Sequence, residues 1–256
     1  MTSQLNRYSN YIFNTKKVAQ NRVVIPPMAS QTADSDGFVT QATIDHYQRL
    51  GLAQAGLMFV EYSYVHPSGK GEASQLGVDS DEKIEGLTSL VQVIHESGSL
   101  AGLQLVHVGG KTTTELTGSA LMAPSSIAVP VKGWSPETPI AMTEVDIENW
   151  IQWFKAAAVR ANQAGFDFIE LHAAHGYGLN QWLSPIINQR QDLFGGTIQN
   201  RSRLLLNIVK EIKSILPKLL IAVRLPAQDH RAILNDPISW NFKNLSPQAL
   251  STEIAA

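Results

Sequence analysis

Short apolar runs alternate with amphipathic segments along most of this chain of 256 residues. Five continuous runs rich in Val, Ile, Leu or Phe predict strands that are buried on both faces. They span residues 23–29, 57–63, 100–107, 166–172 and 219–225. Segments with helical periodicity lie between them, at residues 40–54, 81–97, 144–164 and 200–216. This alternation predicts an α/β fold in which right-handed crossovers build a parallel sheet or barrel.

Local sequence also predicts where two of the helices begin. Thr143 and Asn200 have side chains that can cap a helix N-terminus. Glu144 and Asp146 place negative charge in the first turn of the third helix, where it complements the helix dipole.

The segment 108–142 interrupts the alternation. It is far longer than the usual connection of about 2–6 residues, and it contains the stretch GSALMAPSSIAVP. A long excursion at the C-terminal end of a strand is where a barrel commonly builds the cover of its site. A disordered insertion is the alternative. We favour the cover because the segment has apolar anchors that disordered segments usually lack, namely Leu121, Met122, Ile127 and Val129.

The composition is that of a globular protein, 44% hydrophobic and 16% charged, with a net charge of −2. Such a charge gives no electrostatic reason to expect nucleic acid or an anionic membrane as a partner. The absence of cysteine excludes disulfides and thiolate metal sites, and it favours a reducing cytoplasm. No N-terminal stretch resembles a signal peptide, and no apolar run approaches the about 18–20 residues of a membrane helix. We therefore expect a cytoplasmic protein.

Candidate chemistry gathers where the predicted strands end, because the carboxyl ends of parallel strands meet at one mouth of a barrel. These strand ends carry Pro26, Pro27, Met28 and Ala29, then Glu61 and Tyr62, then Gln104 and His107, then His172, and finally Arg224. An amide that donates and accepts, together with a permanent cation, suits a planar heterocycle that becomes anionic on reduction, such as a flavin. Gln104 as a plain core hydrogen-bonder, and Arg224 as an ion-pair partner of Asp229 or Glu170, remain open.

The stretch LHAAHGYG places His172, His175 and Tyr177 directly after a buried strand. Two imidazoles and a phenol there can hold a developing oxyanion and deliver a proton. A zinc site is one alternative, but no third ligand lies at metal spacing, so we expect no metal. Two purely structural histidines are the other alternative.

Four motifs carry a resemblance to a known family over about residues 21–229. They are NRVVIPPMAS, DHYQRLGLAQAGLMFVEYSYVHPSGK, GLQLVHVGGK and HAAHGYGLNQWLSPIINQRQDLFGGTIQNRSR. They resemble the Old Yellow Enzyme family of FMN-dependent oxidoreductases, whose fold is a (β/α)8 TIM barrel. In that family NAD(P)H reduces FMN, and the reduced flavin passes hydride to an alkene conjugated to a carbonyl or nitro group. The resemblance implies the same ene-reductase cycle and a small unsaturated substrate here.

The resemblance also implies a role for each candidate residue. Pro26, Pro27, Met28, Ala29 and Tyr62 would contact FMN, largely through their backbone. Gln104 would bond the pyrimidine edge of the flavin, and Arg224 would lie near the end that becomes negative. His172 and His175 would bind the substrate's carbonyl oxygen, and Tyr177 would donate the proton. Ala29 stands where many relatives have a Cys or Thr that tunes the flavin, so we do not expect the same tuning here. Gln31 stands where one branch has a tyrosine.

The resemblance breaks after His230. Residues 229–230 match the end of strand five, whereas residues 231–240 resemble the segment that follows strand eight in the family. This predicts an internal deletion between His230 and Arg231. The barrel would be incomplete, with five βα units over residues 1–230, including the 108–142 cover, and a C-terminal helical segment over 231–256.

Of the Gly-Arg that holds the FMN phosphate in the family, only Arg231 remains, so weak flavin retention is expected. A catalytically inactive remnant and a small-ligand-binding barrel are the alternative functions. The sequence does not choose between NADH and NADPH, and a homo-oligomer is possible.

Overall fold

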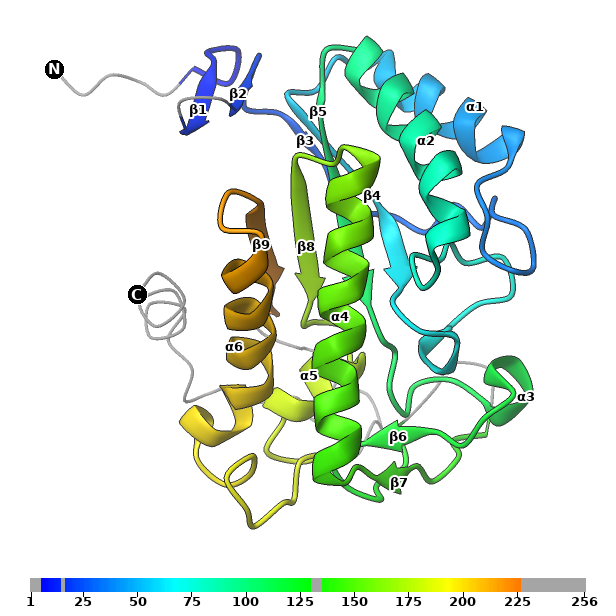
Figure 1. Cartoon of the computed structure of the whole chain (residues 1–256), viewed down its shortest axis with the longest axis vertical. Helices are drawn as coiled ribbons and strands as arrows, with labels where there is room; N and C mark the ends of the chain where they lie inside the picture. Colours follow the sequence, from blue (N-terminus) through cyan, green and yellow to red (C-terminus); the bar gives the residue numbers. More distant parts are fainter. Residues whose placement is uncertain (1–5, 15–16, 130–134, 227–256) are drawn as a thin grey trace, which may run out of the picture.

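Five parallel strands form one curled sheet in this computed structural model, which describes residues 6–14, 17–129 and 135–226 (Figure 1). The order across the sheet follows the chain, β3-β4-β5-β8-β9. These strands are β3 (Val24–Ile25), β4 (Leu57–Tyr64), β5 (Leu100–Val106), β8 (Phe168–His172) and β9 (Leu220–Arg224). Parallel strands that pair in chain order, each followed by a helix, are the units of a (β/α)8 barrel. The predicted fold class, an incomplete barrel of this type, is confirmed. The predicted segment 231–256 and the junction before Arg231 lie outside the described residues.

Four long helices in the described part of the chain cover the outer face of the sheet (Figure 1). They are α1 (Gln41–Gly51), α2 (Ile84–Glu96), α4 (Glu144–Ala164) and α6 (Ile198–Ile215). The bounds of α4 match the prediction because Thr143 and Asp146 form a reciprocal capping box and Gly165 ends the helix with φ 96°. The predicted cap of α6 is wrong. Thr197 is the N-cap, and its hydroxyl accepts from the backbone N–H of Asn200, the third residue of the helix.

The two faces of the sheet carry different side chains because residues alternate along a strand. Leu103 and Leu105 of β5 pack into the main core under the helices. The inner face holds Phe59 and Phe168, and an N-terminal hairpin adds Phe13, whose ring centroid lies 4.6 Å from that of Phe168. This hairpin, β1 (Tyr11–Asn14) and β2 (Lys17–Ala19), therefore packs against the amino-terminal end of the inner face.

The first barrel strand is shorter than predicted. It ends at Ile25, whereas the apolar run continues to residue 29. Pro26 and Pro27 have no backbone N–H and cannot continue a hydrogen-bonded ladder. The loop that follows is fixed at Ser30, whose backbone N–H and hydroxyl both donate to the carboxylate of Glu61.

The segment after β5 contains three short elements, α3 (Thr114–Thr117), β6 (Met122–Ala123) and β7 (Ile140–Ala141). Of its predicted apolar anchors, Leu121 and Val129 are buried, and Met122 and Ile127 are half-buried. Residues 130–134 lie outside the described residues.

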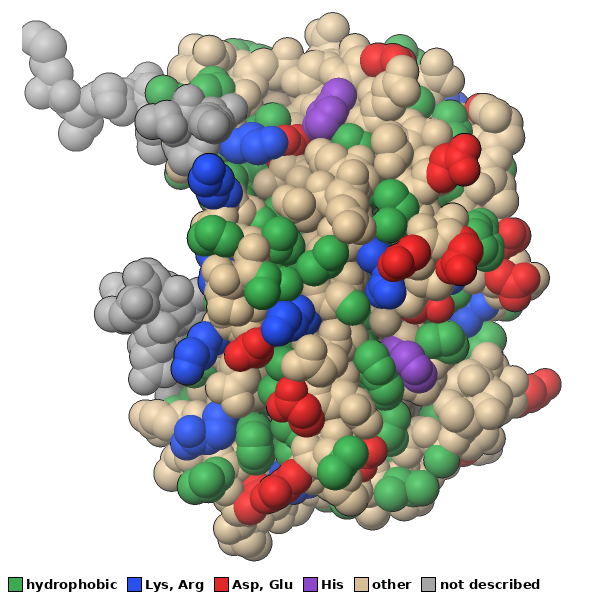
Figure 2. All heavy atoms as spheres, in the orientation of Figure 1, with side chains coloured by type: hydrophobic (Ala, Val, Ile, Leu, Met, Phe, Trp, Pro, Cys, Tyr) green, Lys and Arg blue, Asp and Glu red, His purple; other side chains and the backbone are tan. Residues whose placement is uncertain are grey.

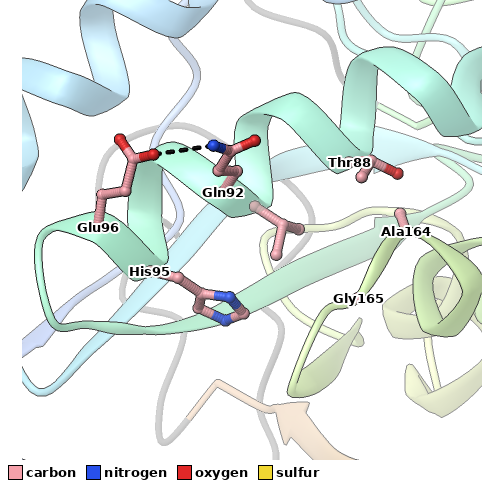
Figure 3. A pocket seen from close by; sticks show the side chains of 7 residues that line it. Thr88, Gln92, His95, Glu96, Ala164 and Gly165 are labelled. Carbon is pink, nitrogen blue, oxygen red and sulfur yellow. Dashed lines mark hydrogen bonds between the residues drawn. The ribbon is translucent and has the colours of Figure 1, made fainter.

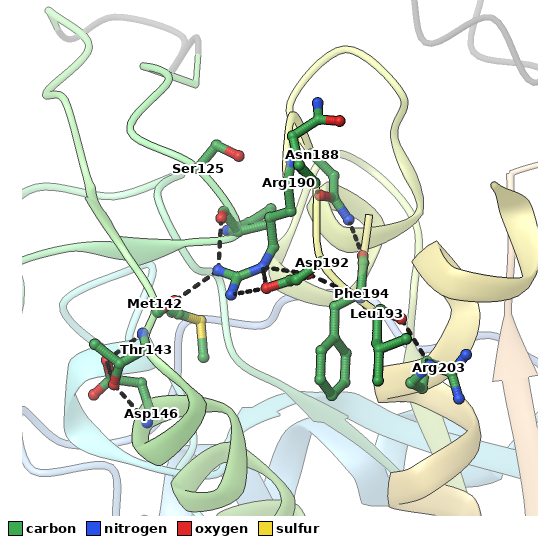
Figure 4. A network of polar contacts seen from close by, with 12 residues as sticks. Ser125, Met142, Thr143, Asp146, Asn188, Arg190, Asp192, Leu193, Phe194 and Arg203 are labelled. Carbon is green, nitrogen blue, oxygen red and sulfur yellow. Dashed lines mark hydrogen bonds and ion pairs between the residues drawn. The ribbon is translucent and has the colours of Figure 1, made fainter. Parts of the chain in front are cut away.

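Arg190 holds this segment against the loop that precedes α6 (Figure 4). Its guanidinium donates to the carbonyl oxygens of Pro124 at 3.1 Å and Met142 at 2.6 Å, and it pairs with Asp192. The described parts of the segment are therefore tied to the body of the protein. Its role as the cover of a site stays a prediction.

Ion pairs connect the helices at the surface. Lys155 of α4 lies 3.0 Å from Glu211 of α6, and Arg160 of α4 lies 2.7 Å from Asp81. Figure 2 shows acidic and basic side chains next to one another over these helices. None of the helices in the described residues is long and apolar enough to cross a membrane.

Candidate active site

A polar row crosses the inner face of the sheet from β5 to β9. Gln104 lies opposite Glu170 in the register, and its side-chain amide donates to the Glu170 carboxylate. Burial raises the pKa of Glu170, while the Gln104 hydrogen bond and the positive charge of Arg224 oppose this rise. Arg224 lies opposite His172, one inward position further along the strands. The structure thus brings Gln104, Arg224 and His172, which the sequence predicts for one site, onto neighbouring inner positions.

Directly beyond this row lies the aromatic cluster that ends β8. The ring centroid of His172 is 5.0 Å from that of His175 and 4.9 Å from that of Tyr177, both in edge-on geometry. His175 has φ 59°, a left-handed conformation that side chains rarely adopt. Gly176, also left-handed, completes the turn before α5 (Gly178–Leu183). The three predicted substrate-facing residues therefore form one cluster.

His172 is a neutral hydrogen-bond donor in this cluster. Burial lowers its pKa to about 3, and the charges of His175, Arg224 and Lys111 act in the same direction. The backbone N–H of Ala174 donates to its Nδ1 at 3.3 Å, so in the neutral ring Nε2 carries the proton. A neutral imidazole that carries its proton on Nε2 suits the stabilisation of a developing oxyanion.

Tyr62 contributes its ring to the cluster. The ring stacks on Tyr177 with centroids 5.5 Å apart, and it packs against Val106 and Val108. Burial, and then the neighbouring Tyr177 and Glu72, raise the pKa of its phenol. Tyr62 was predicted to contact FMN largely through its backbone, and the structure shows that its ring also packs in the cluster.

Residues 26–29 lie in the loop at the carboxyl end of β3, as predicted. The anchored Ser30 holds this loop beside β4. Pro27 is half-buried, whereas Pro26, Met28 and Ala29 are exposed. Their predicted contact with a flavin remains a prediction.

His107 does not belong to this site, so its predicted place at the mouth is wrong. Its ring lies against Trp150 of α4 with centroids 4.1 Å apart, and its Nε2 bonds the Ser68 hydroxyl at 3.0 Å. The reason is the alternation along β5 and its continuation, because Gln104 and Val106 point inward and the next residue points to the helices.

Sequence reasoning assigned no role to two residues that complete the site, Lys111 and Gln181. The Lys111 ammonium lies 5.0 Å from the centroid of the Tyr177 ring and donates to the His175 carbonyl oxygen at 2.6 Å. The buried Gln181 donates to the carbonyl oxygens of Val108 and Gly176. Only the place of Lys111 in the motif GGK, in the turn that follows β5, could have drawn attention to it.

Two further observations delimit the site. No group of three or more His, Cys, Asp or Glu side chains within the described ranges could hold a metal ion. An open groove of about 510 Å³ lies between α2 and the end of α4, beside His95 and Gly165 (Figure 3). These residues precede β5 and β8, so this groove is at the opposite end of the strands from the candidate site.

Five parallel strands with polar side chains at their carboxyl ends place the chain in the TIM-barrel class, whose active sites lie at that end of the strands. A family model for the NADH:flavin oxidoreductase / NADH oxidase family matches residues 13–236. The chain belongs to this family.

Curated relatives and solved structures agree. The NADPH dehydrogenase of Halalkalibacterium halodurans is 42% identical over 81% of this chain and 60% of its own length. The NADPH dehydrogenase of Bacillus subtilis is 41% identical over 82% and 61%. The old yellow enzyme homologue from Zymomonas mobilis superimposes with a TM-score of 0.79 at 28% identity, covering 86% of this chain and 63% of that one. Morphinone reductase in complex with tetrahydroNAD gives 0.79 at 27% identity, over 88% and 65%. The chain thus spans about 60% of the length of these curated relatives, which agrees with an incomplete barrel.

The cofactor of this family is FMN and its reductant is NAD(P)H, so the predicted cofactors are confirmed at the level of the family. Two side chains of the inner face have the chemistry that an FMN ring requires. The Gln104 carboxamide offers a donor and an acceptor, and Arg224 offers a fixed positive charge two strands away. Arg231, predicted at the FMN phosphate, lies outside the described residues.

Proposed function

We propose that this chain forms the flavin-ring and substrate half of an NAD(P)H-dependent FMN oxidoreductase that reduces alkenes conjugated to a carbonyl group. The observation that carries the proposal is the cluster of His172, His175 and Tyr177 directly beyond the inner row of Gln104 and Arg224. A flavin stacked inside the sheet would meet a substrate held at this cluster.

FMN, when bound, supplies the hydride chemistry. The backbone at residues 26–29 and 62, the Gln104 amide and the Arg224 guanidinium orient its ring. Arg224 adds a positive charge that favours the reduced, anionic ring. The hydrogen bond to Glu170 fixes the orientation of the Gln104 side-chain amide before a ligand binds.

The substrate oxygen binds between the two imidazoles. His172 donates from Nε2, and His175 approaches from the adjoining turn. One such donor to a developing oxyanion is commonly worth about 3–4 kcal/mol in the transition state. Tyr177, stacked on Tyr62, then delivers a proton from its phenol to the alkene carbon next to the carbonyl group, while the β-carbon receives the hydride.

The test separates the two halves of the reaction. The protein is titrated with FMN, followed by the flavin spectrum, and NADPH oxidation is then measured with and without cyclohexenone. We expect saturable FMN binding with low affinity, because Arg231 is all that remains of the predicted phosphate-binding pair. Tyr177→Phe should leave flavin reduction by NADPH intact and slow reoxidation by the enone at least tenfold. Tyr11→Phe, at an exposed position, is the matched control.

The predicted alternatives give other outcomes. An inactive remnant shows no saturable change in the flavin spectrum at any FMN concentration, which contradicts the proposal. A small-ligand-binding barrel is stabilised against heat by an enone in the absence of FMN and does not oxidise NADPH. Equal activity of Tyr177→Phe and the unmodified protein would remove Tyr177 from its proposed role.

A further inference from the structure

Two turns meet at the candidate site, and two side chains join them. One turn, residues 108–111, follows β5, and the other, residues 174–178, follows β8. Gln181, fully buried, joins them through its amide, which donates to Val108 at 2.9 Å and Gly176 at 2.8 Å. The backbone N–H of Gly110 returns a hydrogen bond to Gln181 Oε1 at 3.0 Å. The two turns are therefore held in a fixed relation, and Lys111 projects from the first toward the second.

Lys111 contacts the second turn at the residue whose backbone conformation is the least favourable for an L-amino acid. Its ammonium donates at 2.6 Å to the carbonyl oxygen of His175, the residue with φ 59°. A left-handed conformation is unfavourable for a residue with a Cβ, because the Cβ comes too close to the following carbonyl oxygen. A hydrogen bond from a charged donor to the carbonyl of that residue favours the conformation in which the carbonyl faces the donor.

The same ammonium also lies near the ring of Tyr177. The separation of 5.0 Å from the ring centroid is within the range of a cation–π contact. Tyr177 is stacked on Tyr62 as well, so a neighbouring ring and a cation both restrict its rotamer. One lysine therefore fixes the backbone of one proposed substrate-binding residue and the ring of the proposed proton donor.

We propose that Lys111 is a positioning residue, which holds His175 and Tyr177 in their reactive arrangement without itself taking part in proton or hydride transfer. The catalytic part of this inference rests on the proposed function. The conformational part does not, because it concerns the protein without flavin.

The chain offers a matched control. The ammonium of Lys70 makes the same pair of contacts with other partners, because it donates to the carbonyl oxygen of Ser35 and lies 5.6 Å from the centroid of the Tyr64 ring. Lys70→Met removes the same chemistry that Lys111→Met removes. Lys111→Arg retains a cation and a donor at the site.

The first experiment is amide hydrogen exchange in the flavin-free protein. The reporters are the N–H groups of Gly176, Tyr177 and Gly178, each of which has an acceptor in the fold. We expect Lys111→Met to speed their exchange about tenfold, because a charge-assisted hydrogen bond opposes local opening of the turn. Lys111→Arg should stay within about twofold of the unmodified protein, and Lys70→Met should leave these amides unchanged. Unchanged exchange in Lys111→Met, or faster exchange spread over the whole sheet, would overturn the inference.

The second experiment uses the protein loaded with FMN and measures the two half-reactions by stopped flow. Lys111→Met should slow flavin reoxidation by cyclohexenone about tenfold while reduction by NADPH stays within twofold, and Lys111→Arg should restore the first rate. Equal losses in both half-reactions, or no recovery in Lys111→Arg, would count against the positioning role. If the unmodified protein takes up no FMN, the proposed function fails alone, because the exchange experiment still decides whether Lys111 holds the turn.

Discussion

The neutral state of His172 makes a sharp prediction about stability against pH. Its pKa is about 3 in the fold, compared with an ordinary value of 6.5, chiefly because burial disfavours the imidazolium. Below pH 6.5 the unfolded chain therefore binds a proton that the folded chain does not. The contribution of this group to stability is present above pH 6.5 and is lost as the pH falls toward 3. Between pH 7 and pH 5 the loss from His172 alone amounts to about 2 kcal/mol.

The perturbation that tests this is His172→Asn, which removes the titrating ring and retains an acceptor for the Ala174 N–H. The assay is urea unfolding at pH 7 and pH 5, followed by tryptophan fluorescence. We expect the variant to lose about 2 kcal/mol less than the unmodified protein between these two pH values. His46→Asn is the control, because its ring lies half-buried on α1 and should change the pH dependence far less. If His172→Asn loses as much stability as the unmodified protein, His172 is not a buried neutral donor, and its proposed role fails.

Two further substitutions test the scaffold around the site. Gln181→Leu leaves three backbone groups without their partner, so we expect the free energy of unfolding in urea at pH 7 to fall by about 3 kcal/mol. The control Gln152→Leu, at an exposed position on α4, should change it by less than about 0.5 kcal/mol, and equal effects of the two substitutions would contradict the structural role of Gln181. Arg190→Ala frees two carbonyl groups of the segment after β5, so we expect thermolysin to cleave within residues 108–142 much faster than in Arg49→Ala, and an unchanged cleavage pattern would refute the anchoring role.

Local chemistry accounts for most of the fold that the sequence predicts. The helix α4 could be placed to the residue because its capping box lies within three positions of its start and a glycine ends it. The first strand was predicted too long because apolar content alone does not register that Pro26 and Pro27 break a ladder. The cap of α6 was misplaced because both Thr197 and Asn200 are capping residue types, and only the backbone geometry distinguishes them.

Some residues of the candidate site could be predicted from the local sequence, and others could not. His172, His175 and Tyr177 lie within one short stretch, so their cluster could be predicted from the sequence. His107 was misassigned because a position at a strand end does not say which face it occupies, and a count by twos from Gln104 would have placed it on the helix side. Lys111 and Gln181 could not have been assigned, because the contacts that connect them to another barrel unit, Lys111 to His175 and Gln181 to Val108, span 64 and 73 residues of the chain.

Contacts from outside the turn after β8 hold the cluster of His172, His175 and Tyr177 in its geometry. His175 has a left-handed backbone, which costs about 1–2 kcal/mol, and such a conformation persists only when the surroundings over-determine it. Here three contacts do so from outside the turn: the Lys111 hydrogen bond to His175, the Gln181 hydrogen bond to Gly176, and the Asn180 oxygen that accepts from the Gly176 N–H at 2.8 Å. Two of these come from α5, which follows the turn in the same βα unit, and one comes from the turn after β5, so the conformation of His175 depends in part on a neighbouring barrel unit. An isolated HAAHGY sequence would therefore lack the geometry, and the chemistry proposed for this chain is a property of its assembled sheet.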